Sequence, residues 1–317
     1  MRAIVTTLAL GAAMASGLWS SALPPAASAL EAEASPPVAP GPFPKAVRSP
    51  LGERVTLRAQ PKRIVSIALS ADEILIDLVP PERLAGITIF VDDPATSPVS
   101  ARAPRTAARV TGEPEALLAL EPDIVFASAY TRPEAVSLLT GAGIPVVGVG
   151  TLTTFEDVLR SVTTLGDAVG EPGRALEIVT SVRARIDAVV TRPHGRHARV
   201  LLWDGGYTYG SGTLQDDIVR LAGGVNIAAA EGLHGPSALT EEASVGFDPE
   251  VILVPSEGAT PRANAPELLG GDPIWSATGA ARRGDVYGVP RAWIGCVSHH
   301  AVRAVEAVAA ILDGRPE

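Results

Sequence analysis

The sequence predicts an α/β protein in which two Rossmann-like lobes with parallel sheets are joined by one long helix. Short hydrophobic strands alternate with helices in both halves of the chain, which is the pattern of parallel βα units. Between the halves, residues 172–190 keep an uninterrupted apolar stripe, with Pro172 in the first turn and Pro193 beyond the last. About twenty residues at about 1.5 Å each span about 30 Å, roughly the width of a small domain. A crossover helix inside one large α/β domain is the alternative interpretation.

The predicted elements follow the same plan in each half. The expected strands are 63–68, 84–88, 123–127 and 145–149 in the first half, and 199–203, 250–254 and 286–289 in the second. The expected helices are 71–78 with Ser70 as N-cap, 114–120, 133–140, 214–222 and 298–312. The chain then divides into a signal peptide (1–29), a flexible tether (30–50), an N-terminal lobe (51–168), the backbone helix (169–192) and a C-terminal lobe (193–317).

A local pattern is repeated in the two halves. In each half, a short helix ends in an acidic–proline–acidic run that leads into a hydrophobic strand, at Leu120–Val125 and again at Phe247–Val251. Two similar lobes facing one another would bring the strand ends and their loops together around a cleft. A cleft of this kind is where ligands bind in open α/β sheets.

The N-terminal residues predict export. Arg2 precedes an apolar run from Ala3 to Leu18, and Ala27-Ser28-Ala29 is a small-residue cleavage site, as in a secretory signal peptide. No cysteine lies near the cleavage site, so we do not expect a lipoprotein. The following residues, up to Pro50, are rich in Pro, Ala and Glu, which is typical of a flexible tether.

Composition excludes several classes of function. The formal net charge is −9, which argues against a nucleic-acid partner, and no basic amphipathic segment suggests a membrane surface. The sole cysteine, Cys296, cannot form an internal disulfide. An exported α/β hydrolase is a distant alternative, but Gly210-Ser211-Gly212 lacks the Gly-x-Ser-x-Gly spacing, and neither a phosphate-binding loop with lysine nor HExxH occurs. We therefore expect a protein that is not an enzyme.

At this point the motifs resemble those of periplasmic binding proteins with a helical backbone, the class that delivers ferric siderophores, haem, corrinoids or metal ions to ABC importers. The resemblance covers nearly everything from Pro61 to Leu312. The motifs that carry it are Pro61–Ser66, Ser70–Leu75, Leu120–Val125, Ala142–Val147, Ala222–Asn226, Thr240–Glu242, Asp248–Ile252 and Gly284–Tyr287. The resemblance implies a monomeric periplasmic protein that captures a corrinoid or ferric siderophore and hands it to a permease and its ATPase. Alternatives of the same fold are a haem receptor, a Zn²⁺ or Mn²⁺ receptor, and a module that presents its ligand to a sensor.

The resemblance also implies two permease-docking glutamates. By motif match they fall on Glu73 and Glu242, with Glu241 as a possible substitute for the second. Two exposed carboxylates far apart could fix the orientation of the protein on a basic partner. The alternative is a pair of solvated glutamates at helix starts, where the helix dipole favours them.

Aromatic residues gather in the loops that should line the cleft, where rigid aromatic surfaces suit a large flat ligand with polar edges. The candidate ligand-binding residues are Phe90, Asp92, Tyr130, Trp203, Tyr207, Tyr209 and Trp293. Packing in the core or at the rim is the alternative for each of them, and it is the role expected for Phe126, Phe247, Trp275 and Tyr287.

Histidine placement argues against a receptor for a bare metal ion. Such a site would draw imidazoles and carboxylates from both lobes, yet all five histidines follow the backbone helix. We therefore expect neither a bound metal nor a cofactor of the protein's own. His299 and His300, at the start of the last helix, are the weak exception, and contact with water is the simpler role for them.

Overall fold

A computed structural model of the chain describes residues 43–50, 52–192, 197–257 and 265–314. The predicted signal peptide and most of the predicted tether lie outside these ranges. The described residues all belong to one compact unit. Within the described ranges, no helix combines the length and apolar character needed to cross a membrane.

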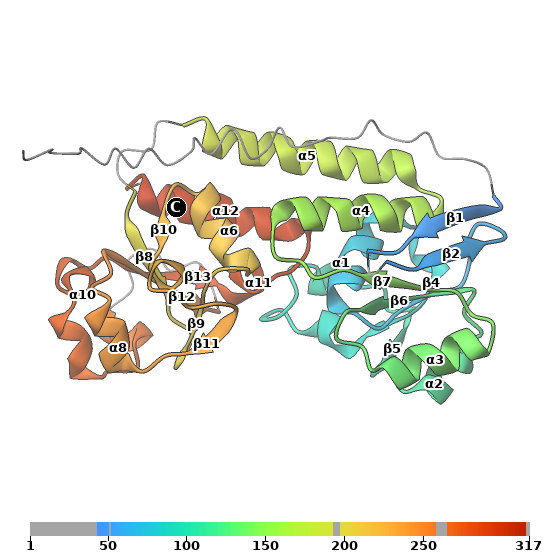
Figure 1. Ribbon diagram of the computed structural model, residues 1–317, viewed down its shortest axis with the longest axis horizontal. Helices are drawn as coiled ribbons and strands as arrows, with labels where there is room; N and C mark the ends of the chain where they lie inside the picture. The colour runs from blue at the N-terminus through green and yellow to red at the C-terminus, as the bar shows by residue number, and fades with distance from the viewer. Residues whose placement is uncertain (1–42, 51, 193–196, 258–264, 315–317) are drawn as a thin grey trace, which may run out of the picture. The chain divides into compact units, whose positions relative to one another are not determined.

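The α/β class is confirmed by two parallel sheets (Figure 1). The first sheet has five parallel strands in the order β5-β4-β3-β6-β7. Its strands are β3 (Ile64–Ser66), β4 (Leu84–Thr88), β5 (Ala108–Val110), β6 (Ile124–Ser128) and β7 (Val146–Val149). The helices of this half are α1 (Leu69–Leu78), α2 (Pro114–Leu118), α3 (Pro133–Gly141) and α4 (Phe155–Val169), with short 3₁₀ turns η2 (Pro81–Arg83), η3 (Ile89–Asp92) and η4 (Ser100–Arg102).

The second sheet has four parallel strands in the order β10-β8-β12-β13. Its strands are β8 (Arg199–Leu202), β10 (Val225–Asn226), β12 (Val251–Ser256) and β13 (Val286–Pro290), and β9 (Tyr207–Tyr209) pairs separately with β11 (Pro236–Ala238). The helices are α6 (Leu214–Leu221), α7 (Ile227–Ala230), α8 (Glu241–Gly246), α9 (Ala265–Leu268), α10 (Gly279–Arg283), α11 (Arg291–Ile294) and α12 (Val302–Leu312), with 3₁₀ turns η5 (Pro273–Ala277) and η6 (His299–Ala301).

Helix α5 (Pro172–Val190) has both of the bounds predicted from the sequence. It lies along α4 from the first half and α12 from the second (Figure 1). Its buried stripe faces those two helices and comprises Ala175, Ile178, Val182, Ile186 and Val189. Arg185 adds a two-pronged ion pair with Glu306 of α12, at 2.7 and 2.6 Å. One helix therefore packs on both halves, while the division into two lobes at this helix stays a prediction.

The repeated acidic–proline–acidic pattern corresponds to a repeated backbone structure. Glu121 and Asp248 are the two non-glycine residues with positive φ among the described residues, at 46° and 48°. Asp123 accepts hydrogen bonds from the backbone N–H of Arg63, and the Glu250 carboxylate accepts one from the backbone N–H of Arg199. In both halves a carboxylate thus ties the end of a tight turn to the neighbouring strand.

The predicted tether is wrong at its C-terminal end. Residues Lys45–Arg48 form β1, which pairs antiparallel with β2 (Arg54–Leu57). Val47 is buried in the core, and Lys45 forms an ion pair with Asp167 of α4 at 2.7 Å. The N-terminal half therefore begins before the predicted boundary at residue 51, because a single strand rich in charge carries no recognisable period.

The start of the first helix also differs from the prediction. Helix α1 begins at Leu69, its N-cap residue is Ala68, and no side chain caps it. The predicted cap, Ser70, lies inside the helix and is buried. Helix α4 was not predicted at all, although its capping box between Thr154 and Asp157 is a recognisable signal.

Candidate functional site

A pocket of about 310 Å³ lies at the carboxyl ends of strands from both halves of the chain. The loop after β4 supplies one wall, and the ends of β12 and β13 supply the other. Its lining residues are Pro94, Ala95, Ser97, Pro98, Ser100, Ser256, Glu257, Pro290, Ala292 and Trp293. We call this the cargo pocket, because it lies where strand ends meet in a doubly wound fold and ligands usually bind. Trp293, a predicted ligand-binding residue, is one of its walls.

Asp92, also predicted to touch ligand, is engaged by the protein itself. Arg109 of β5 donates to both of its carboxylate oxygens at 2.7 Å, through Nε and Nη2. These hydrogen bonds lower the pKa of Asp92. The next residue, Asp93, accepts the Ala95 N–H at 2.9 Å and the Thr96 hydroxyl at 2.7 Å. The two carboxylates therefore shape the loop that forms one wall of the cargo pocket.

Three of the predicted aromatic residues present large open surfaces. Phe90 and Tyr207 are each 57% exposed, and Tyr130 is 86% exposed. They follow the ends of β4, β8 and β6 respectively, on the same edges of the two sheets as the cargo pocket. Their position at these strand ends, where ligands bind in folds of this kind, keeps these side chains as candidates for ligand contact.

A second cluster lies beside the cargo pocket at the ends of β8 and β13. Arg291 donates to both oxygens of Asp204, at 2.8 and 3.0 Å, and Tyr209 donates its hydroxyl to Asp204 at 3.2 Å. Burial and the nearby carboxylate raise the pKa of Tyr209. A separate pocket of about 760 Å³ adjoins this cluster, and its lining includes Asp204, Arg291, Trp203, Glu241 and Glu242.

Trp203, another candidate for ligand contact, presents little open surface, and its role stays a prediction. Its side chain is buried with 5% exposure, and it packs edge-on against Trp275 with ring centroids 4.9 Å apart. Both Trp203 and Trp293 follow strand ends in the sequence. Tertiary packing makes them differ, because it buries Trp203 and leaves Trp293 at the pocket wall. The core roles expected for Phe126, Trp275 and Tyr287 are confirmed by their burial.

Glu73 is not the exposed docking carboxylate that the motif match implied. It is 1% exposed, and its two oxygens accept hydrogen bonds from Ser97 Oγ at 2.9 Å and Cys296 Sγ at 3.2 Å. Burial raises its pKa. The docking role expected for Glu73 is therefore wrong, because the side chain joins α1 to the segment before η6. Glu242, in contrast, is exposed in the first turn of α8.

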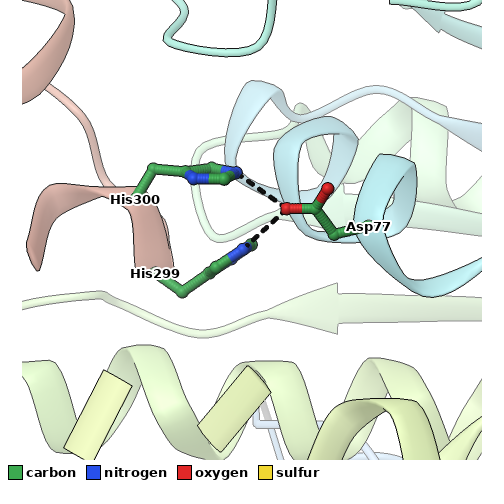
Figure 2. Close-up of side chains that lie close together, drawn as sticks. All are labelled: Asp77, His299 and His300. Carbon is green, nitrogen blue, oxygen red and sulfur yellow. Dashed lines mark hydrogen bonds and ion pairs between the residues drawn. The ribbon is translucent and has the colours of Figure 1, made fainter. Parts of the chain in front are cut away.

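His299 and His300 are buried rather than solvated. Figure 2 shows both imidazoles pointing at the carboxylate of Asp77, with each Nε2 2.9 Å from Asp77 Oδ2. The other oxygen, Oδ1, pairs with Arg102. We call these four residues the clasp. Sequence reasoning missed Asp77, which lies in the last turn of α1.

The charges of the clasp follow from its surroundings. Burial raises the pKa of Asp77, but hydrogen bonds from His299, His300 and Arg102 outweigh this and lower its pKa far below the ordinary value. Burial lowers the pKa of His300 to about 4. At neutral pH the clasp therefore contains the Asp77 carboxylate, the Arg102 guanidinium and the neutral imidazole of His300.

Single ligand atoms of Asp77, His299 and His300 lie within 4.8 Å of one another, close enough together to be the ligands of a metal ion. A metal would share the carboxylate with Arg102, whose Nη2 is also 3.5 Å from His300 Nε2. A metal on Nε2 of His299 would move the ring proton to Nδ1, which is buried without a partner. Metal-bound histidines usually donate that proton to an acceptor. The donor set therefore fits a hydrogen-bonded clasp better than a metal centre.

Asp72 gives the fold a pH dependence. Its Oδ2 accepts hydrogen bonds from Thr88, while Oδ1 is buried with no partner. Burial, opposed by hydrogen bonds from Ser66 and Thr88, raises the pKa of Asp72 to about 7. Because an unfolded aspartate has a pKa of about 3.9, the folded state binds the proton more tightly. Stability is therefore highest below about pH 4 for this group and is lost as the pH rises to about 7.

We expect Asp72→Asn to flatten this dependence. Urea unfolding at about pH 4.5 and about pH 8 should show a loss of stability of a few kcal/mol for the native protein and a smaller loss for the variant. The neighbouring Glu73, whose pKa is also raised, remains in both proteins, so their difference isolates Asp72. An equal loss of stability between the two pH values in both proteins would show that Asp72 does not retain its proton in the folded state.

Comparison with known proteins assigns the family. A family model described as periplasmic binding protein matches residues 64–292. The chain belongs to the periplasmic binding protein family. The family predicted from the sequence motifs is thereby confirmed, and it is a family of binding proteins rather than enzymes.

Similar members of the periplasmic binding protein family bind diverse ligands. A cobalamin-binding protein of Halobacterium salinarum is 27% identical over 248 residues, covering 74% of this chain and 65% of that protein. The chain thus spans just under two thirds of that relative's length. An ABC transporter substrate-binding lipoprotein of Bacillus subtilis, YvrC, is 26% identical over 258 residues, covering 78% of each chain.

Solved structures of periplasmic binding proteins share the fold. The molybdate-binding protein MolA of Haemophilus influenzae has a TM-score of 0.72 and 21% identity, covering 85% of this chain and 91% of that one. The vitamin B12 binding protein BtuF of Vibrio cholerae has a TM-score of 0.64 and 19% identity, covering 81% of this chain and 98% of that one. At these identities the likeness establishes the fold, and the ligand has to be argued from the pocket.

Proposed function

We propose that this protein is the substrate-binding component of an ABC importer, and that it captures a metal chelate, either a corrinoid or a ferric siderophore. The observation that carries the proposal is the cargo pocket, whose walls come from both halves of the chain and include Trp293. Exposed Phe90 and Tyr130 follow strands on the same edge of the first sheet. Similar proteins named for cobalamin, vitamin B12 and heme binding support a chelate as the cargo.

A chelate fits the cargo pocket better than a bare metal ion does. Zn²⁺ and similar ions need three or four histidine, cysteine or carboxylate ligands that converge on one point. Among the described residues, the pocket lining contains one carboxylate, Glu257, and no histidine or cysteine. Among the described residues, the clasp is the one place where three such groups converge, and it is formed by α1 and η6 rather than by the pocket. A ligand that brings its own metal coordination needs no such ligands from the protein, and can bind to walls of proline, alanine, serine and tryptophan.

The test is isothermal titration of the metal-stripped protein, produced without its signal peptide. The probes are cyanocobalamin, a ferric trihydroxamate, a ferric tricatecholate, haem and Zn²⁺. We expect tight one-to-one binding of a corrinoid or ferric siderophore and none of Zn²⁺. Binding of Zn²⁺ alone would contradict the proposal and favour a metal-ion receptor.

Delivery to the permease should depend on the acidic start of α8. Reversing the charge in the double variant Glu241→Lys, Glu242→Lys should reduce uptake at least about tenfold, because these glutamates would meet a basic docking surface. The affinity of the double variant for cargo should not change, since neither glutamate lines the cargo pocket. The measurement is uptake of labelled cargo by cells that carry each variant.

The matched control for this experiment is Glu115→Lys, which makes the same change at an exposed position in the first turn of α2. We expect uptake with this variant to equal that of the native protein. Normal uptake with the double variant would show that α8 is not a docking surface. The proposal further places the protein in the periplasm as a monomer, with the permease and its ATPase as partners.

A further inference from the structure

We infer that the cargo carries no net negative charge: it is a neutral or cationic chelate. This inference rests on the proposed function and narrows its ligand. The cargo pocket has a single charged side chain among its described lining residues, the carboxylate of Glu257. The other walls are proline, alanine, serine and Trp293, which present apolar surface and hydroxyl groups.

The arginine nearest in sequence to the pocket walls is already neutralised. Arg291 lies between the lining residues Pro290 and Ala292, but both of its terminal nitrogens are bound to Asp204. Tyr209 donates to the same carboxylate and helps to hold it in place. This two-pronged ion pair neutralises the guanidinium, so a negatively charged ligand would gain little attraction from Arg291 while the pair stays intact.

The arginine beside the opposite wall is neutralised in the same way. Arg109 donates Nε and Nη2 to Asp92, and its Nη1 donates to the backbone carbonyls of Pro104 and Ala107. Asp93, which precedes the lining residue Pro94, adds an exposed carboxylate held by Thr96 and Ala95. Both of these arginines are therefore neutralised by carboxylates, and the one charged side chain among the described lining residues, Glu257, is negative.

This arrangement discriminates by charge. Like charges about 10 Å apart at an effective dielectric constant of about 20 repel strongly enough to weaken binding about tenfold. Binding sites commonly reject the wrong ligand through such unfavourable charge placement. A ligand with several carboxylates or phenolates would be repelled by Glu257, while Arg291 and Arg109 are already neutralised by aspartates. A ligand edged with amides, or with one ammonium group, would not be repelled.

The test uses two scaffolds whose charge can be varied at constant shape. One series is cyanocobalamin and its derivatives in which peripheral amides are hydrolysed to carboxylates. The other is a ferric trihydroxamate with a free terminal amine, its acetylated form and its succinylated form, which are cationic, neutral and anionic. A ferric tricatecholate and haem serve as anionic probes. Affinities are measured by isothermal titration at low and at moderate salt.

For the scaffold that binds, we expect neutral or cationic members to bind at least tenfold more tightly than the matched anionic member. Added salt should narrow this difference, because it screens the pocket charges. Glu257→Gln should strengthen binding of the anionic member relative to the neutral one about tenfold. The control is Glu115→Gln, which lies away from the pocket. It should leave the ratio of the affinities for the neutral and the anionic member unchanged.

Two failures are distinguishable. Tight binding of the tricatecholate, or of an anionic member at least as tightly as its neutral counterpart, would overturn the charge inference and leave the proposed function standing. Tight binding of haem alone would overturn both. The absence of binding by every chelate in the panel would overturn the proposed function, and the charge inference with it.

Discussion

Replacing Trp293 with alanine should weaken cargo binding by about a hundredfold or more. Its side chain is a wall of the cargo pocket, partly buried at the end of α11. A large aromatic anchor in a central pocket commonly accounts for about 2–4 kcal/mol of binding free energy. Titration of the variant with the cargo found for the native protein measures the effect directly.

The control for Trp293 is Leu138→Ala, which removes an apolar side chain of α3 that is 56% exposed and does not line the cargo pocket. Its affinity should equal that of the native protein. Trp293→Phe should keep much of the binding, because a planar ring remains in place. An affinity of Trp293→Ala within about threefold of the native value would show that cargo does not stack on this residue.

Replacing Asp77 with alanine should lower the free energy of unfolding by about 3–5 kcal/mol. The change removes the only carboxylate of the clasp and leaves His299, His300 and Arg102 without their shared acceptor. Breaking a buried charged network by removing one partner typically costs this much. Urea unfolding at neutral pH, followed by circular dichroism, measures the difference.

Two further variants make this result specific to the clasp. Asp77→Asn keeps one oxygen as an acceptor and should be intermediate in stability. Glu177→Ala removes the partner of Arg174 in an ion pair whose side chains are 68% and 52% exposed, and should cost less than about 1 kcal/mol. If Asp77→Ala is as stable as Glu177→Ala, the clasp contributes little to the fold.

The long-range contacts set the limit of what the sequence could predict. Helix α5 and the strand series were predictable because each has its own period, and the repeated turns at Glu121 and Asp248 were visible as a repeated pattern. The partner of His299 could not be predicted, because Asp77 lies 222 positions earlier in the chain and no local pattern joins the two residues. These contacts form only once the two halves fold together.

The same limit explains the errors among the predicted site residues. Motif matching identified Glu73 but could not show that Cys296 and Ser97 bury it. Trp203 and Trp293 follow strand ends in the same manner, but Trp203 is buried in a hydrophobic cluster that includes Trp275, whereas Trp293 lines the cargo pocket. A residue's position after a strand predicts its approximate place in the fold, whereas its exposure depends on neighbours distant in sequence.

The most direct test of the cargo pocket is a crystal structure with bound cargo, with anomalous scattering measured at the absorption edge of the chelated metal. We expect one strong anomalous peak in the pocket between the loop at residues 94–100 and Trp293, with the chelate stacked on the indole ring. A peak at Asp77 and the two histidines, or a chelate bound away from the residues of the cargo pocket, would show that the cargo pocket is not the binding site.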